Sequence, residues 1–394
     1  MSRVLSNSKL RDALFGGAIL TMLVSLLLFP TQAVEAARDG VSISINVILP
    51  SLFPFFVLST LCVELGLVRT LGKLLRPVMR PLFRVSGSCA GAFLLGIVGG
   101  YPVGARTAIE LYRKNQCSRT EAERMLSFCN NSGPAFILGV VGAGVFSSSS
   151  AGLWLYGAHV AASILVGLLF RFYRRKEAPV SAALQEVRTE THFADAFTGS
   201  VRQALTATLS ICGFVIFFTV LIRLLFLTDL LPKLAYALTV LLGRFGLRQS
   251  WAESLLTGAI EMTSGVWSLR DMAGAMGDKL CMAAFILGWA GLSVHCQVLS
   301  FIGSSGLSTR TYFFGKLLHG LISAVLIFLL SRLLGWNRPV STYLATQVGA
   351  IAGLRFSRAL SVSTAVSLTV LLSLLVIYLG FLIRDYGNRR KNRV

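Results

Sequence analysis

Residues 94–105 read LLGIVGGYPVGA, and residues 255–266 read LLTGAIEMTSGV. Each stretch is an apolar segment interrupted by glycine and by a polar or proline-containing turn. Corresponding interruptions in two halves of a membrane chain are the best sequence pointer to the site of an inverted-repeat carrier. The two stretches therefore predict an internal repeat with the interrupted segments at its centre.

The composition predicts an all-α polytopic membrane protein. Of the 394 residues, 54% are hydrophobic and 14% are charged, and the mean hydropathy is +0.71. This is more apolar side chain than a soluble domain can bury. The formal net charge of +20 could indicate that the chain binds nucleic acid. However, the basic residues lie at the ends of apolar runs, as cytoplasmic anchors do. We therefore expect a lipid bilayer and no nucleic acid as the partner.

The sequence contains no recognisable catalytic or metal-binding motif. Its seven cysteines include no CxxC pair, and its four histidines, at 159, 192, 295 and 319, form no HExxH or other ligand set. A nucleophile elbow, a P-loop, a kinase set and paired catalytic carboxylates are also missing from the sequence. We expect no metal, no cofactor and no enzymatic activity.

Eight apolar segments have about the 20 residues that a helix needs to cross the hydrocarbon core. They are residues 13–29, 46–65, 125–146, 152–172, 205–227, 280–302, 312–334 and 360–383. The first is either an uncleaved helix or a signal peptide with a cleavage site in the Ala-Val-Glu-Ala sequence at 33–36. Its apolar stretch is longer than the usual signal-peptide core, which favours the uncleaved helix.

Basic clusters predict the orientation of these segments. Four clusters fall at residues 69–84, 113–124, 171–176 and 389–393, and placing all of them in the cytoplasm gives eight crossings with both termini inside. Residues 88–112 must then enter and leave on the same side, as a re-entrant hairpin that turns at the glycines and proline of the first stretch. By the same count, residues 249–270 form a second hairpin that enters from the outside.

The predicted elements repeat. A span, an amphipathic stretch, a hairpin, a broken span and a plain span follow one another twice, and the two halves begin on opposite sides of the membrane, as in an inverted-topology repeat. The predicted parts are an N-terminal helix and outer segment (1–45), the first repeat (46–172), a cytoplasmic linker (173–204), the second repeat (205–334), and a last helix with a basic tail (335–394). A shift of 161 residues places Gly104 on Gly265 and Ser132 on Ser293.

The third segment contains a run of five residues that form helices poorly, Asn130-Asn131-Ser132-Gly133-Pro134. The proline frees backbone carbonyl groups, and unwound backbone at membrane depth occurs only inside protein or along a wet cavity. We expect a substrate-binding site here. The alternative is a proline kink whose asparagines bond to neighbouring helices.

The second hairpin carries Glu261, Thr263, Ser264 and Gly265 at its turn. A carboxylate at the bilayer centre costs about 2.5–3.5 kcal/mol, so Glu261 needs donors, a cation or a proton. It is the candidate for handling a coupling ion or proton, and the others are candidates for binding substrate. The alternative role of Glu261 is to cap a half-helix by accepting backbone N–H bonds.

The remaining candidates lie at the first hairpin and in the sixth span. The first hairpin offers Tyr101, Pro102, Gly104 and Arg106, and the sixth span offers Ser293, His295 and Gln297. Arg106 is suited to binding a carboxylate or phosphate. The alternative is an ordinary interfacial arginine whose side chain extends to the cytoplasm. His295 is either a ligand or a packed residue that bridges helices.

Two longer stretches show a resemblance to a known family. They are GGYPVGARTAIELYRK at 99–114 and SRTEAERMLSFCNNSGPAFILGVVGAGVF at 118–146. They resemble the sporulation integral membrane proteins of the nucleoside-recognition Gate-domain class, of the stage V type, over about residues 49–334. The resemblance implies a spore-forming Firmicute, an outer forespore membrane with both termini on the mother-cell side, and a role in moving dipicolinic acid toward the spore.

The wider Gate class is similar to concentrative nucleoside carriers and to the membrane gates of ferrous iron transporters. In those carriers the two hairpin turns and the facing broken helices hold the substrate. The resemblance maps this site onto residues 101–104, 130–134, 261–265 and 293–297. Nucleoside carriers have a Gln-Thr-Glu type turn where this chain has Gly-Tyr-Pro, which argues against a nucleoside as substrate.

These observations predict a secondary transporter for a small anionic metabolite, with dipicolinic acid as the leading substrate. The candidate site offers amides, hydroxyls and a guanidinium, which suit an aromatic dicarboxylate. Glu261 would disfavour a dianion unless it is protonated or paired. A nucleoside-type permease and a membrane gate or scaffold that acts only with a partner remain alternatives, and the chain is compatible with a homo-oligomer or with other sporulation membrane proteins as partners.

Overall fold

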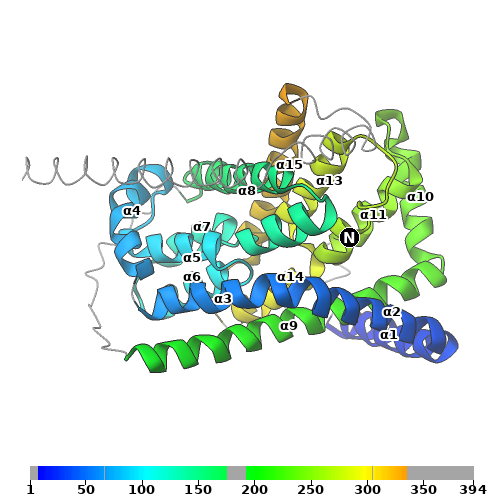
Figure 1. Cartoon of the computed structure of the whole chain (residues 1–394), viewed down its shortest axis with the longest axis horizontal. Coiled ribbons are helices and arrows are strands. Elements are labelled where there is room, and N and C mark those ends of the chain that lie inside the picture. The colour runs from blue at the N-terminus through cyan, green and yellow to red at the C-terminus, as the bar shows by residue number, and fades with distance from the viewer. Residues whose placement is uncertain (1–7, 66, 175–191, 304, 335–394) are drawn as a thin grey trace, which may run out of the picture. The chain divides into compact units, whose positions relative to one another are not determined.

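The computed structural model describes residues 8–65, 67–174, 192–303 and 305–334, and within these ranges the chain is helical (Figure 1). The helices in chain order are α1 (Ser8–Leu28), α2 (Pro30–Ile43), η1 (Ser44–Ile48), α3 (Leu49–Glu64), α4 (Leu67–Phe83), η2 (Gly87–Cys89), α5 (Ala90–Val98), α6 (Val103–Arg113), α7 (Arg119–Phe128), η3 (Ala135–Val145), α8 (Ser149–Phe170), α9 (Phe193–Leu227), α10 (Leu230–Leu242), η4 (Gly243–Phe245), α11 (Gln249–Ile260), α12 (Met262–Trp267), α13 (Met276–Trp289), α14 (Gly291–Gly303) and α15 (Thr309–Leu333). The all-helical fold agrees with the prediction from composition.

Among the described residues, fewer helices than predicted have the length and apolarity to cross a membrane. The five that do are Pro30–Cys62, Ser149–Phe170, Phe193–Leu227, Met276–Gly303 and Thr309–Leu333, and a sixth results if Leu75–Phe83 and Gly87–Val98, bent by 112°, count as one span. The apolar part of α1, Phe15–Leu28, is shorter than such a span. The predicted third span is divided between α7 and η3. The predicted eighth span, the basic tail and most of the linker lie outside the described residues.

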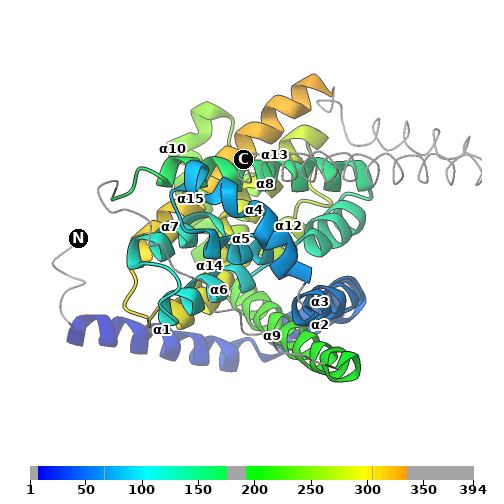
Figure 2. The same cartoon turned by 90° about the vertical axis from the view of Figure 1, so that its left-hand side faces the viewer.

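The segment with the candidate cleavage site is a packed helix. Residues 33–36 lie within α2, where Ala33 and Ala36 are buried, and α2 packs against α9 (Figures 1 and 2). A Cβ on Gly40 would lie 2.9 Å from the backbone of Ile216. This close approach makes α2 part of the folded body.

The described helices follow one another in a similar order in the two halves of the chain. The first half has α3, α4, the pair α5 and α6, the broken pair α7 and η3, and then α8; the second half has α9, α10, the pair α11 and α12, the broken pair α13 and α14, and then α15. In each hairpin the two helices pack against each other. The opposite orientation of the halves in a membrane remains a prediction.

The two hairpins meet the two broken spans at the centre of the fold. Helix α6 contacts α7 of its own half and α14 of the other half, while α12 contacts α13 and η3 in the same way. Helix α15 packs against α13, α8 and α7. The interrupted segments of both halves are therefore neighbours in space, although more than 100 residues separate them in the sequence.

A buried ionic network joins several helix ends. Arg124, 1% exposed, donates to the carbonyl oxygens of Arg84 and Tyr173. Glu123 accepts from the Tyr173 hydroxyl at 2.8 Å and from the backbone N–H of Ser308 at 3.1 Å. The charge count places all of these segments in the cytoplasm, and the structure brings them together at one place.

Candidate functional site

The first broken span is unwound where the Asn-Asn-Ser-Gly-Pro run predicts. Helix α7 ends at Phe128 and η3 begins at Ala135, and Asn130, Asn131 and Ser132 are at most 1% exposed. The Asn131 amide donates to the Phe128 carbonyl, 3.0 Å away. The backbone N–H of Ser132 donates to Nε2 of His159, also at 3.0 Å. Within the described residues the Ser132 hydroxyl is buried without a hydrogen-bond partner.

The second broken span is interrupted earlier than expected. Helix α13 ends at Trp289, and α14 begins at Gly291 after Ala290, with φ of 81° at Ala290 and 76° at Gly291. The break is therefore a left-handed turn that glycine tolerates and alanine rarely adopts. Ser293, His295 and Gln297 lie on α14 itself, and not at an unwound point.

His295 is a packed residue that bridges helices. It is buried, and its Nδ1 lies 2.8 Å from the Tyr312 hydroxyl of α15. Its ring also contacts the rings of Trp289 and Phe313. This geometry fits the packing alternative, and His295 does not line the pocket described below.

The turn of the first hairpin lies directly against the first break. A Cβ on Gly96 or Gly104 would overlap the carbonyl oxygen of Cys129, so only glycine allows this approach. Gly104 thus positions α6 against the break. Tyr101, 8% exposed, donates its hydroxyl to the carbonyl of Leu287 at 2.8 Å. That carbonyl belongs to the last turn of α13, where carbonyls lack intrahelical donors, so Tyr101 links the hairpin of one half to the broken span of the other.

Arg106 lies on α6 with its side chain exposed and does not reach the pocket. Its role as an anion ligand in that pocket is not supported by the structure. Pro102 is the N-cap residue of α6 and likewise does not line the pocket.

At the second hairpin, Glu261 caps α12. It is 3% exposed, and its two carboxylate oxygens accept from the backbone N–H groups of Thr263 at 3.0 Å and of Ser264 at 2.6 Å. The helix amides supply the donors that a buried carboxylate needs. Gly265 packs against Gly258, where a Cβ would overlap the backbone. The capping alternative therefore describes Glu261 in this structure.

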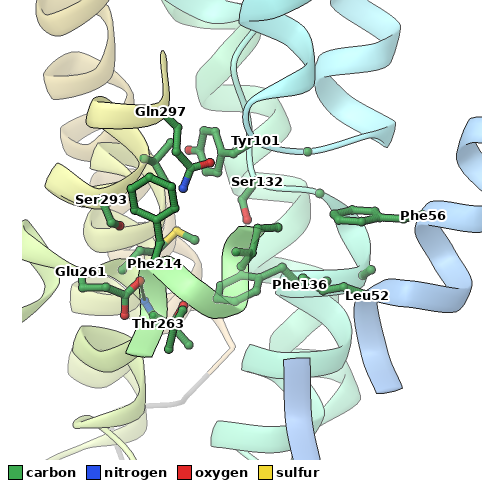
Figure 3. Close-up of a pocket in the computed structure, with 17 residues that line it drawn as sticks. Leu52, Phe56, Tyr101, Ser132, Phe136, Phe214, Glu261, Thr263, Ser293 and Gln297 are labelled. Carbon is green, nitrogen blue, oxygen red and sulfur yellow. Dashed lines mark hydrogen bonds between the residues drawn. The ribbon is translucent and has the colours of Figure 1, made fainter. Parts of the chain in front are cut away.

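A cavity of about 50 Å³ lies where the two hairpins, the two broken spans, α3 and α9 meet (Figure 3). Of the predicted site residues, it is lined by Tyr101, Ser132, Gly133, Glu261, Thr263, Ser293 and Gln297. The other candidates do not line it: Pro102, Gly104, Arg106, Asn130, Asn131, Pro134, Ser264, Gly265 and His295. Figure 3 shows Gln297 beside Tyr101 at the top of the view, Ser132 and Ser293 below them on opposite sides, and Glu261 and Thr263 lower still.

A buried lysine behind this cavity was not among the predicted residues. Lys316 of α15 is 1% exposed, and its Nζ lies 2.8 Å from the Tyr101 hydroxyl, 2.9 Å from the Asn130 carbonyl oxygen and 3.3 Å from Nδ1 of His319. Nε2 of His319 lies 2.9 Å from the carbonyl oxygen of His159. The signal was present in the sequence, because Lys316 and His319 are ionisable residues inside a predicted span, and such residues indicate function by default.

Known proteins resemble this chain in sequence and in fold. The family model Gate, described as nucleoside recognition, matches residues 45–170. The structure of CNTnw in an inward-facing substrate-bound state superposes with a TM-score of 0.52 at 16% identity, covering 83% of this chain and 87% of that chain. A variant of CNTnw in an outward-facing state gives a TM-score of 0.53 at 15% identity, covering 83% and 88%. At these identities the likeness concerns the fold alone.

A sporulation protein is much more similar to this chain in sequence than CNTnw is. The sporulation integral membrane protein YlbJ of Bacillus subtilis (strain 168) is 34% identical over 355 residues, which cover 84% of this chain and 86% of that protein. This agrees with the resemblance carried by the stretches at 99–114 and 118–146. The chain is thus an integral membrane protein with a transporter-like helical fold, and it belongs to the family of the sporulation integral membrane protein YlbJ.

Proposed function

We propose that the chain is a secondary transporter of the sporulating cell, and that it moves dipicolinic acid, a small anionic metabolite, across the outer forespore membrane by alternating access. The observation that carries the proposal is the cavity lined by both hairpins and both broken spans. In inverted-repeat transporters the substrate binds where discontinuous helices of the two repeats meet. Membership of a sporulation family supports the cellular setting.

The lining of the cavity suits a small aromatic acid. The hydroxyls of Ser132, Thr263 and Ser293 and the amide of Gln297 supply hydrogen-bond donors, while Phe56, Phe136 and Phe214 supply an apolar wall for a ring. A cavity of about 50 Å³ holds a few waters. We therefore expect a hairpin or α9 to move when a dicarboxylate binds.

The carboxylate in this lining is compatible with an anion. Both oxygens of Glu261 are engaged by backbone N–H groups of α12, so part of its charge is offset by the helix end. We propose that Glu261 shapes the hairpin turn and that another group couples transport to an ion.

Liposomes that contain the purified full-length chain test the proposal. We expect saturable uptake of labelled dipicolinate and little uptake of labelled uridine, measured side by side. Thr263→Val removes a lining hydroxyl and should weaken uptake, whereas the control Thr239→Val removes a hydroxyl that bonds only within α10 and should leave uptake unchanged. Uptake of uridine alone would contradict the choice of substrate, and uptake of neither would favour a gate that acts with a partner.

A nucleoside-type permease is the second candidate, because the Gate model is described as nucleoside recognition and the fold resembles CNTnw. Against it stands the first hairpin, where the Tyr101 hydroxyl is already bonded to Leu287 and Lys316. The side-by-side uptake measurement separates the two substrates.

A further inference from the structure

Lys316 links elements that must move relative to each other if the chain alternates between two states. Its Nζ contacts Tyr101 at the first hairpin turn and the Asn130 carbonyl at the first break. Through His319 it is joined to His159 of α8, and through Tyr101 to Leu287 of α13. Lys316 itself belongs to α15, so one side chain connects both halves of the molecule.

The hydrogen-bond partners of Lys316 require three N–H donors. The Tyr101 hydroxyl already gives its only proton to the Leu287 carbonyl, so it accepts from Lys316. The Asn130 carbonyl can only accept. Nε2 of His319 faces a carbonyl oxygen and must carry the ring proton, which leaves Nδ1 as an acceptor. An ammonium group has three N–H donors and satisfies all three contacts, whereas a neutral amine has two.

Among the described residues, this ammonium has no carboxylate partner within ion-pair distance. The titratable groups that face it from the surrounding elements are Tyr101, Cys129, His159, His295 and His319, and His295 in turn bonds to Tyr312. His159 accepts at Nε2 from the Ser132 N–H, which a neutral ring can do and an imidazolium cannot. Within the described ranges, neutral acceptors therefore hold the positive charge.

We propose that Lys316 is a proton-binding site whose occupancy is linked to closure of the first hairpin turn onto the break at residues 130–134. In the closed geometry the bound proton completes three hydrogen bonds. When the turn and the break separate, the acceptors from Tyr101 and Asn130 are lost, and a buried ammonium without acceptors is costly. The ammonium then becomes a neutral amine by releasing one proton to water, and no other bond is made or broken.

The proton site at Lys316 adds proton coupling to the proposed transport. Only this coupling rests on the proposed function, and the linkage between the proton and closure does not. Linkage of one proton to closure changes the closing equilibrium about tenfold for each pH unit above the transition. The linkage belongs to the protein alone and can be measured without substrate.

Hydrogen–deuterium exchange of the purified full-length chain in nanodiscs tests the linkage. Amides of residues 99–104 and 129–134 are followed over a range of pH after correction for the intrinsic exchange rate. We expect their protection in the wild type to fall about tenfold per pH unit above a single transition. The same peptides are followed in Lys316→Met, which cannot bind the proton, and in Lys316→Arg, which keeps its charge at every accessible pH.

The matched control is Lys279→Met, because Lys279 is also a buried lysine and donates to the carbonyl of Arg270, which belongs to neither peptide. We expect Lys316→Met to be poorly protected at every pH, Lys316→Arg to stay protected without a transition, and Lys279→Met to follow the wild type. Wild-type protection that does not change with pH overturns the proposal. A pH transition in Lys316→Arg at the same pH as in the wild type also overturns the proposal. If Lys316→Met does not fold, the result for Lys316→Arg decides between the two outcomes. Liposomes that take up no dipicolinate, together with a pH transition that depends on Lys316, would refute the transport function and leave the proton site standing.

Discussion

Gly96 and Gly104 determine how closely the first hairpin approaches the first break, because a Cβ on either would overlap the Cys129 carbonyl oxygen. Gly104→Ala forces the two segments apart, and overpacking of this kind costs about 1–3 kcal/mol. We expect a lower midpoint of thermal unfolding for the purified protein. Gly91→Ala, in α5 of the same hairpin, meets nothing within 4 Å and should leave the midpoint unchanged or raise it. Equal midpoints for both variants would show that the close approach is not required.

Ser132 lines the cavity, and its hydroxyl has no hydrogen-bond partner in the part of the chain that the structure describes. A buried polar group without a partner costs about 1–3 kcal/mol, so Ser132→Ala should preserve or increase thermal stability. If substrate supplies the missing partner, the same variant should lower affinity for dipicolinate several-fold in the uptake assay. The contrast is Ser163→Ala, since the Ser163 hydroxyl donates to the Phe128 carbonyl at 2.7 Å and its loss should lower stability. Unchanged affinity in Ser132→Ala would remove Ser132 from the site.

At the scale of elements, Glu123 holds together the beginnings of α7 and α15 and the end of α8. It is buried, and it accepts from Arg119 at 3.0 Å, from Tyr173 at 2.8 Å and from the Ser308 N–H at 3.1 Å. Burial raises the pKa of Glu123, but the bonds from Arg119, Tyr173 and Ser308 outweigh burial and hold the pKa below its usual value. A carboxyl with a lowered pKa stabilises the folded state at pH values above its usual pKa. This stability is lost as the pH falls through the lowered pKa.

Glu123→Gln should therefore cost about 1–3 kcal/mol at neutral pH. The difference from the wild type should shrink below about pH 4.3, the usual pKa of a glutamate, and vanish when Glu123 itself becomes protonated. Thermal unfolding of both proteins, measured from neutral pH to below about pH 4.3, gives this difference in stability. Glu110→Gln is the control, because Glu110 pairs with Lys114 on an exposed helix face and its substitution should change the stability little. A cost for Glu123→Gln that is independent of pH would contradict the role of the charge.

The two breaks show what the sequence can predict about such elements. The first was predicted correctly because Asn130 to Pro134 disfavour helix by their own chemistry. The second was expected near Ser293 and lies at Ala290, because a left-handed alanine is selected by the surrounding packing and leaves no local signal. The partners of Lys316 come from two other segments of the chain, so their arrangement follows from tertiary structure, although the lysine itself is conspicuous in an apolar run.

At the scale of the whole molecule, contacts between distant segments join ends that the basic clusters predict to lie on the same side of the membrane. Glu123, Tyr173 and Ser308 belong to predicted cytoplasmic ends and meet in one network. On the predicted outer side, Asp39 pairs with Arg223 at 3.3 Å. Each of these contacts joins two ends of the same predicted side, and the inverted topology itself remains a prediction.

The inverted repeat predicts that the residues just after the two hairpins face opposite sides of the membrane. Lys114 follows α6 and Ala273 follows α12, and both are exposed. In an expression host, a membrane-impermeant maleimide should label Ala273→Cys in intact cells and Lys114→Cys only in inverted vesicles, because the basic cluster at residues 113–124 anchors its end in the cytoplasm. The wild type, with its own seven cysteines, gives the background. Labelling of both positions from one side would mean that the hairpins enter from the same face, and the inverted repeat would then be wrong even though the order of elements repeats.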